Sequence, residues 1–167
     1  MYKKNKILSI AIINLENDMN VGGIIRTANA AGVNEVFIVG RKKWKKGAST
    51  GAHRKTKIIN MRTTDEFLDY AKENNYSIVS LEITEKSENI FHFNYPDKTI
   101  IVIGNEGKGI PEKIILNSLS IIKIPQYGEI ECLNAAISAG IAIFDWVRKN
   151  QTKNENKIID NKFKNFI

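Results

Sequence analysis

Short apolar runs alternate with helix-like segments along this chain. Each apolar run is too short for a helix and is bounded by polar residues, so we expect buried strands at residues 7–13, 35–39, 77–81, 99–103 and 120–124. Segments with helical periodicity separate or follow these runs, at residues 21–31, 65–74, 111–116 and 133–148. Such alternation is typical of an α/β fold, a parallel sheet covered by helices on both faces.

Two helix starts carry local signals. Thr63, with Glu66 three residues later, has the spacing of a capping box. Asn20 stands where an N-cap residue belongs, immediately before an apolar helical series. Gly22 and Gly23 follow in the first turn, although glycine weakens a helix. Two glycines there indicate that another group approaches the helix backbone closely.

Length and composition favour a single cytoplasmic domain. The 167 residues are 43% hydrophobic and 26% charged, with a net charge of +7 and a pI of about 9.4. This charge favours a polyanionic partner such as nucleic acid. Lysines precede the first apolar run as in a secretory signal, but no cleavage pattern follows, and the run is too short to span a membrane. The single cysteine, Cys132, fits a reducing compartment.

The chain divides into a main domain and a tail. We expect one domain at residues 1–148 and a basic tail at residues 149–167, dominated by Lys and Asn. The apolar positions of the tail have partial helical spacing, which predicts a short docked helix.

A basic loop follows the second predicted strand. Residues 41–57 contain eight Lys or Arg and no acidic residue, which favours contacts with phosphate groups. Trp44 lies within the cluster and could stack on an unpaired base or cover the edge of the core; both alternatives stay open. The residues expected to contact RNA are Arg41, Lys42, Lys43, Trp44, Lys45, Lys46, Arg54 and Lys55.

A glycine-rich loop follows the strand at 99–103. It lacks the Gly-Lys-Ser/Thr of a P-loop, and the dinucleotide fingerprint G-x-G-x-x-G is also absent. The alternative of a generic nucleotide-binding protein is therefore not supported by any phosphate-binding motif. The loop does contain Gly104, Glu106 and Gly109 in the pattern G-x-E-x-x-G. By itself this pattern fits a nucleotide loop and an ordinary strand-to-helix turn equally well.

Three motifs considered together are more specific. They are residues 20–28 (NVGGIIRTA), residues 104–110 (GNEGKGI) and residues 124–134 (IPQYGEIECLN). In order and spacing they resemble the motifs of the SpoU (TrmH-type) branch of the SPOUT RNA methyltransferases. The resemblance extends from about residue 7 to residue 148.

This resemblance implies an enzyme that transfers a methyl group from S-adenosylmethionine to a ribose 2′-hydroxyl of tRNA or rRNA. It also implies a deep trefoil knot at the C-terminal end of the domain and a homodimer, and the apolar last helix would gain burial in such a dimer. No metal is expected, since neither histidine has metal-ligand spacing. The implied catalytic residues are Asn20, Arg26, Glu106, Cys132 and Asn134. The implied cofactor-binding residues are Leu81, Gly104, Gly109, Ile124, Cys132 and Leu133.

Two positions depart from the family pattern. Gln126 replaces a methionine, and Cys132 replaces a serine that helps to position the arginine and the cofactor. Cysteine is a weaker hydrogen-bond donor, which puts the rate in doubt more than cofactor binding. The alternative is a catalytically weak or silent RNA-binding protein with the same fold. Intact Asn20, Arg26 and Glu106, together with Asn134, favour the enzyme.

The role of Arg26 and the choice of substrate need separate arguments. A guanidinium remains protonated, so Arg26 is better suited to grip an RNA phosphate and stabilise the developing alkoxide than to act as a base. Many rRNA-directed members carry an additional N-terminal RNA-binding domain, which this chain lacks, so tRNA is slightly favoured. The residues do not indicate the target base.

Overall fold

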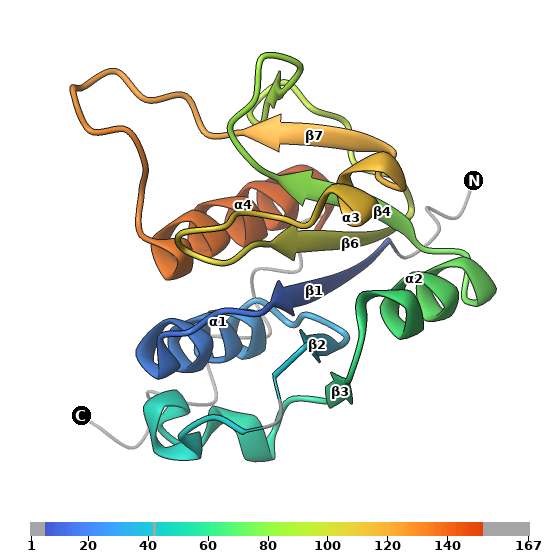
Figure 1. Ribbon diagram of the computed structural model, residues 1–167, viewed down its shortest axis with the longest axis vertical. Coiled ribbons are helices and arrows are strands. Elements are labelled where there is room, and N and C mark those ends of the chain that lie inside the picture. Colours follow the sequence, from blue (N-terminus) through green and yellow to red (C-terminus); the bar gives the residue numbers. More distant parts are fainter. Residues whose placement is uncertain (1–5, 42, 152–167) are drawn as a thin grey trace.

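The fold is built on a seven-stranded sheet, and the computed structural model describes residues 6–41 and 43–151. All strand pairs are parallel, in the order β3-β2-β1-β6-β4-β7-β5 (Figure 1). The strands are β1 (Ile7–Ile13), β2 (Val36–Val39), β3 (Ile58–Met61), β4 (Ser77–Leu81), β5 (Glu88–Asn89), β6 (Lys98–Ile103) and β7 (Ser120–Lys123). The α-helices are α1 (Asp18–Ala30), α2 (Thr64–Glu73), α3 (Glu112–Leu116) and α4 (Ala135–Asn150).

Each face of the sheet has its own core. Along β1, Ile10 and Ile12 belong to one buried cluster, while Ala11 and Ile13 belong to the other, as the alternation of side chains in a strand requires. The first cluster includes residues of α1 and α4, and the second includes residues of α2 and α3. The predicted parallel sheet with helices on both faces is therefore confirmed.

Most predicted elements are present, and the differences have local causes. β3 and β5 were not predicted, because β3 has four residues directly after the basic loop and β5 has only two. Asn20 is not the N-cap of α1: Asn17 is, and its side chain accepts a hydrogen bond of 2.8 Å from the N–H of Met19. Two asparagines three residues apart offered two possible starts, and the helix begins at the earlier one.

The capping prediction for α2 is correct. The Thr63 side chain caps the helix by accepting from the N–H of Glu66, at 3.2 Å. The Glu66 carboxylate accepts in return from the N–H of Arg62, at 2.7 Å, one residue before the cap.

Helix α4 continues to Asn150, two residues beyond the predicted domain boundary. Its last turn is anchored by Asp145, whose carboxylate pairs with Arg148 and Lys149 and accepts from the hydroxyl of Tyr95. The Asp145 carboxylate is buried, and these three partners compensate its charge. The docked helix predicted in the tail lies outside the described residues. Within residues 6–41 and 43–151, no helix is long and apolar enough to cross a membrane.

The strand order decides which loops meet. β1, β6, β4 and β7 are consecutive neighbours in a parallel sheet, so the segments after them leave from the same edge. The segment after β7 extends away from the sheet before it returns to α4 (Figure 1). The three sequence motifs lie in these segments and in the helices that follow them.

Candidate functional site

A series of hydrogen bonds joins the three motifs. The Asn20 side chain donates to the Glu106 carboxylate, with a distance of 2.9 Å between Nδ2 and Oε1. Asn134 donates to the side-chain oxygen of Asn20, with 3.0 Å between Nδ2 and Oδ1. Asn134 in turn caps α4, because its Oδ1 accepts from the N–H groups of Ala136 and Ile137. One residue from each motif therefore contributes to a single polar network.

The Glu106 carboxylate at one end of this series and the N–H groups of α4 at the other end fix the orientation of the two side-chain amides between them. A carboxylate can only accept, and the backbone N–H groups of α4 can only donate. Asn20 must therefore direct its nitrogen toward Glu106, and Asn134 must direct its nitrogen toward Asn20. Aspartate at either position would remove a donor.

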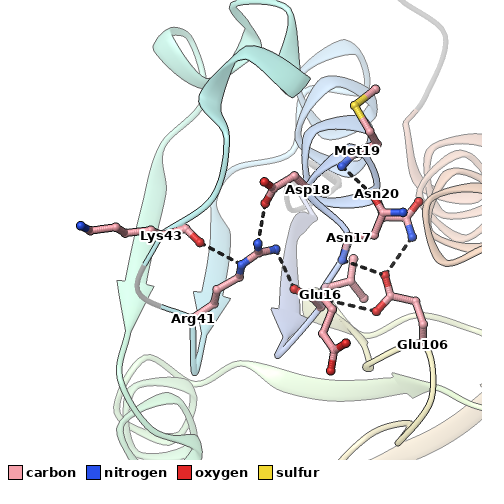
Figure 2. Close-up of polar contacts among 9 residues, drawn as sticks. Glu16, Asn17, Asp18, Met19, Asn20, Arg41, Lys43 and Glu106 are labelled. Atoms are coloured by element: carbon pink, nitrogen blue, oxygen red, sulfur yellow. Dashed lines mark hydrogen bonds and ion pairs between the residues drawn. The ribbon is translucent and has the colours of Figure 1, made fainter.

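Glu106 also holds the start of α1. Its carboxylate accepts from the N–H of Glu16 at 3.1 Å and from the N–H of Asn17 at 3.4 Å (Figure 2). Burial by itself raises the pKa of Glu106. Hydrogen bonds from Asn20 and from backbone N–H groups lower the pKa by more than burial raises it, so the pKa lies below its ordinary value of 4.5. The carboxylate is thus held in its charged form at the positive end of the helix.

Asn105 also stabilises the site, although the sequence did not identify it. Its Oδ1 accepts from the N–H groups of Gly107 and Lys108, both at 2.9 Å, which forms a local turn. Its Nδ2 donates to the carbonyl of Asn14 at 2.8 Å, so the loop after β6 is tied to the segment after β1. The only signal available was an asparagine at a variable position of the motif.

A cavity of about 420 Å³ adjoins this network, and Asn134 and Glu106 form part of its wall. Gly104 is needed beside it, since a Cβ there would lie 2.5 Å from the carbonyl carbon of Gly109. All six residues predicted to bind the cofactor line the cavity: Leu81, Gly104, Gly109, Ile124, Cys132 and Leu133. Their role toward a ligand remains a prediction.

The third motif forms an open segment between β7 and α4. Cys132 is exposed and lies at the wall of the cavity. Gln126, the other departure from the family pattern, donates to the carbonyl of Glu131 at 3.4 Å. A Cβ on Gly128 would meet no atom within 4 Å, so this conformation does not require glycine for packing.

Arg26 lies apart from the network. It is exposed and six residues after Asn20, which places it about 9 Å further along the helix axis. It follows Gly23 by three residues and Gly22 by four, so it shares their side of α1. A Cβ on Gly23 would contact the Ala136 side chain of α4 at 3.4 Å. Arg26 therefore lies on the side of α1 that faces α4 and the basic loop.

The basic loop packs against α1 at Gly22. A Cβ on Gly22 would lie 2.3 Å from the carbonyl carbon of Ala48, so the loop approaches the helix backbone as closely as the paired glycines predicted. The loop contains two 3₁₀ turns, η1 (Lys46–Ser49) and η2 (Ala52–Arg54). Five of the cations expected to contact RNA are exposed: Lys43, Lys45, Lys46, Arg54 and Lys55. Lys42 lies outside the described residues.

Arg41 differs from these cations because its guanidinium is engaged in the fold. It pairs with Asp18 at 2.5 Å and donates to the carbonyls of Leu15 at 2.8 Å and Lys43 at 2.9 Å (Figure 2). These contacts attach the start of the loop to the start of α1. Arg41 thus has a structural role in addition to the RNA contact predicted for it.

Trp44 and His53 are also part of the loop packing. Trp44 is half-buried against the core, as one of its two predicted roles requires, and its ring contacts His53 edge-on, with 6.0 Å between centroids. The buried Ser49 hydroxyl donates to the carbonyl of Lys46, so the His53 Nδ1 at 2.7 Å is the donor of their hydrogen bond. These contacts hold the loop in one shape.

Comparison with known proteins relates the chain to a family and to individual relatives. The model of the SpoU rRNA Methylase family matches residues 7–144. A tRNA (guanosine(18)-2′-O)-methyltransferase of Aquifex aeolicus is 28% identical over 155 residues, which is 90% of this chain and 74% of that protein.

Solved structures share the fold. A TrmH/SpoU tRNA modifying enzyme of A. aeolicus has a TM-score of 0.78 and 26% identity, over 92% of this chain and 83% of that one. An AdoMet-bound rRNA methyltransferase from Sinorhizobium meliloti has a TM-score of 0.82 and 24% identity. This alignment covers 91% of this chain but only 60% of the S. meliloti protein, so this chain matches only part of that protein's length.

Proposed function

The chain belongs to the SpoU rRNA Methylase family, and on this premise we propose that it methylates a ribose 2′-hydroxyl of tRNA or rRNA with S-adenosylmethionine. The observation that carries the proposal is the network of Asn20, Glu106 and Asn134 beside the cavity. It joins all three motifs at the edge of the sheet where α/β proteins bind nucleotides.

The cavity suits a nucleoside cofactor. Its volume of about 420 Å³ lies in the range of small-molecule sites. Leu81, Ile124 and Leu133 supply apolar surface for a purine, and Gly104 and Gly109 place no side chain in the cavity wall. When bound, S-adenosylmethionine supplies a sulfonium methyl group for transfer.

The residues of the chain supply position and charge. Glu106, Asn20 and Asn134 hold the starts of α1 and α4 against the cavity. Arg26, exposed on the side of α1 that faces α4 and the basic loop, binds an RNA phosphate and stabilises the oxyanion that develops on the ribose. The proton leaves to a phosphate or to water, because the guanidinium cannot accept it.

RNA lies across the basic loop and the exposed side of α1 that carries Arg26. Neutralising Lys45, Lys46, Arg54 and Lys55 to glutamine weakens RNA binding and lowers the slope of log affinity against log salt by about 0.7 for each lost phosphate contact with single-stranded RNA. A matched variant neutralises four cations of other surfaces: Arg62, Lys72, Lys86 and Lys113. Equal slopes for the two variants would remove the loop from the interface.

Three further features belong to the proposal. The segment from β7 to α4 forms a trefoil knot, and the chain works as a homodimer. The protein acts in the cytoplasm, which contains its RNA substrates and keeps a free cysteine such as Cys132 reduced. The knot and the dimer are supported by family membership. The exposed apolar side chains of α4, Ile137 and Phe144, also support the dimer.

The test is methyl transfer to unmodified RNA. Purified protein is incubated with S-adenosylmethionine and unmodified tRNA or rRNA, and the digested RNA is analysed by mass spectrometry. A new 2′-O-methyl nucleoside identifies both the activity and the target base. The similarity to an A. aeolicus tRNA enzyme makes tRNA the first substrate to test. RNA binding without methylation would favour the catalytically silent protein, provided that no cofactor binds either.

Arg26 variants test the assigned role. We expect Arg26→Ala to lower the turnover about 100-fold, in the range seen when a residue that stabilises an oxyanion is removed. Arg26→Lys keeps the charge but loses the planar fork, so it also lowers turnover, by about tenfold. Arg62→Ala, an exposed arginine on another surface, is the control and leaves turnover unchanged. Near-normal turnover of Arg26→Lys would exclude bidentate phosphate binding.

A further inference from the structure

Glu82 is a carboxylate in the cavity wall that none of the three motifs contains. It follows the last residue of β4 and lines the cavity beside Leu81. Its Oε2 accepts from the N–H of Ile110 at 3.0 Å, and its Oε1 accepts from the N–H of Ile83 at 3.1 Å. The carboxylate is therefore held between the segment after β4 and the loop after β6.

The two cavity carboxylates differ in how they are used. Glu106 accepts from two backbone N–H groups and from Asn20, all of which hold the start of α1. Glu82 accepts two hydrogen bonds, whereas a carboxylate offers about four acceptor positions. Its remaining positions suit a ligand that donates hydrogen bonds.

The position of Glu82 indicates which donor. In parallel α/β sheets, an acidic residue at the carboxyl end of a strand commonly accepts hydrogen bonds from ribose hydroxyls. Glu82 directly follows β4, a central strand, and lies in the cavity wall beside the apolar Leu81 and Ile124, whereas the other cavity carboxylate, Glu106, is already engaged at the start of α1. We propose that Glu82 is a specificity-determining residue that binds the ribose hydroxyls of the cofactor. This inference rests on the cofactor cavity of the proposed function.

A ligand–variant cycle tests it by isothermal titration calorimetry. The ligands are S-adenosylhomocysteine and its 2′-deoxy and 3′-deoxy analogues, and the proteins are wild type, Glu82→Ala and Glu82→Gln. For the wild type, removing a hydroxyl that donates to the carboxylate weakens binding about tenfold or more. In Glu82→Ala we expect this ratio to fall below about threefold. Glu85→Ala, an exposed acid of the same connection, retains the wild-type ratio.

The cycle separates recognition from positioning, because Glu82 also holds Ile110. If Glu82→Ala weakens all three ligands equally, Glu82 only positions the loop, and the proposal is overturned. S-adenosylmethionine is titrated in the same way. If Glu82→Ala weakens its binding but not that of S-adenosylhomocysteine, the carboxylate recognises the sulfonium charge, and the proposal is overturned. Glu82→Gln preserves the side-chain shape in case the alanine variant folds poorly. Failure of the wild type to bind any of these ligands would instead overturn the cofactor assignment, and this proposal with it.

Discussion

At the scale of single residues, the direction of each hydrogen bond restricts which side chain is acceptable. Asn20 must donate to Glu106 and accept from Asn134 at the same time. An amide does both, whereas a carboxylate only accepts. The asparagines are therefore required by the polarity of the network, in addition to their shape and size.

Asn20→Asp tests this polarity. The variant places a second carboxylate against Glu106, where the present distance is 2.9 Å, and we expect it to lower the free energy of unfolding by about 1–3 kcal/mol. The difference in stability from the wild type shrinks as the pH falls toward about 4, because repulsion between the two carboxylates raises the pKa of one of them, which is then protonated and can donate. Urea unfolding measures both effects. Asn94→Asp, at an exposed loop position, is the control, and equal losses in the two variants would contradict the assignment.

Glu106 gives a second prediction from pH. Its pKa is lowered on folding, so its contribution to stability is present above its ordinary pKa of 4.5 and is lost as the pH falls through the folded value. The wild type is therefore more stable than Glu106→Gln at about pH 7, and the difference shrinks toward about pH 4. Urea midpoints across this range check it. Glu129→Gln, an exposed acid, should show no such trend, and a difference for Glu106→Gln that is independent of pH would refute the assignment.

At the scale of elements, α1 is held at three places. The N–H groups of Glu16 and Asn17 at its start donate to the Glu106 carboxylate, the basic loop packs on Gly22, and α4 packs near Gly23. Arg26 lies between the last two contacts. Its position relative to the cavity therefore depends on how closely two neighbours approach the helix backbone.

The two glycines of α1 form a matched pair for this idea. In Gly22→Ala the new methyl group would lie 2.3 Å from the Ala48 backbone, so we expect a loss of about 1–3 kcal/mol in unfolding free energy and weaker RNA binding. In Gly23→Ala the methyl group meets only the Ala136 side chain at 3.4 Å, and the better helix propensity contributes up to about 1 kcal/mol. Thermal unfolding compares them, and similar melting temperatures would show that the loop can move aside.

At the scale of the whole molecule, the described chain leaves apolar surface on two adjacent helices. Ile137, Ile141 and Phe144 recur on one side of α4, and the side chains of Ile137 and Phe144 are 57% and 50% exposed. Met19 of α1 is 68% exposed. Because Ala135 and Ser138 of α4 line the cavity, a second copy on this surface would lie close to the site.

The proposed dimer gives the prediction at this scale. We expect Ile137→Glu combined with Phe144→Glu to convert a dimer into monomers, since two buried charges without partners cost far more than the contact provides. Sedimentation velocity measures the mass. Leu116→Glu, at a 75% exposed position on α3, is the control and leaves the dimer intact. A monomeric wild-type protein at micromolar concentration would refute the homodimer.

Several features were beyond the reach of the sequence for physical reasons. Asn17 and Asn20 are equally good caps in isolation, and the contacts of Glu106 with the segment before α1 accompany the earlier start. Asn105 occupies a variable position of its motif and Glu82 lies outside the motifs, and their partners are backbone groups far away in sequence. Local propensity contains no information about such partners.

By itself, the sequence determined the α/β class, the parallel sheet, the family and the motifs, because hydrophobic periodicity and motif spacing are local properties of the chain. The tertiary structure decided which of the motif residues contact one another. It joined Asn20, Glu106 and Asn134, left Arg26 exposed on the next turns of α1, and engaged Arg41 in holding the basic loop. These outcomes depend on strand order and helix packing, which bring together groups that are up to 114 residues apart along the chain.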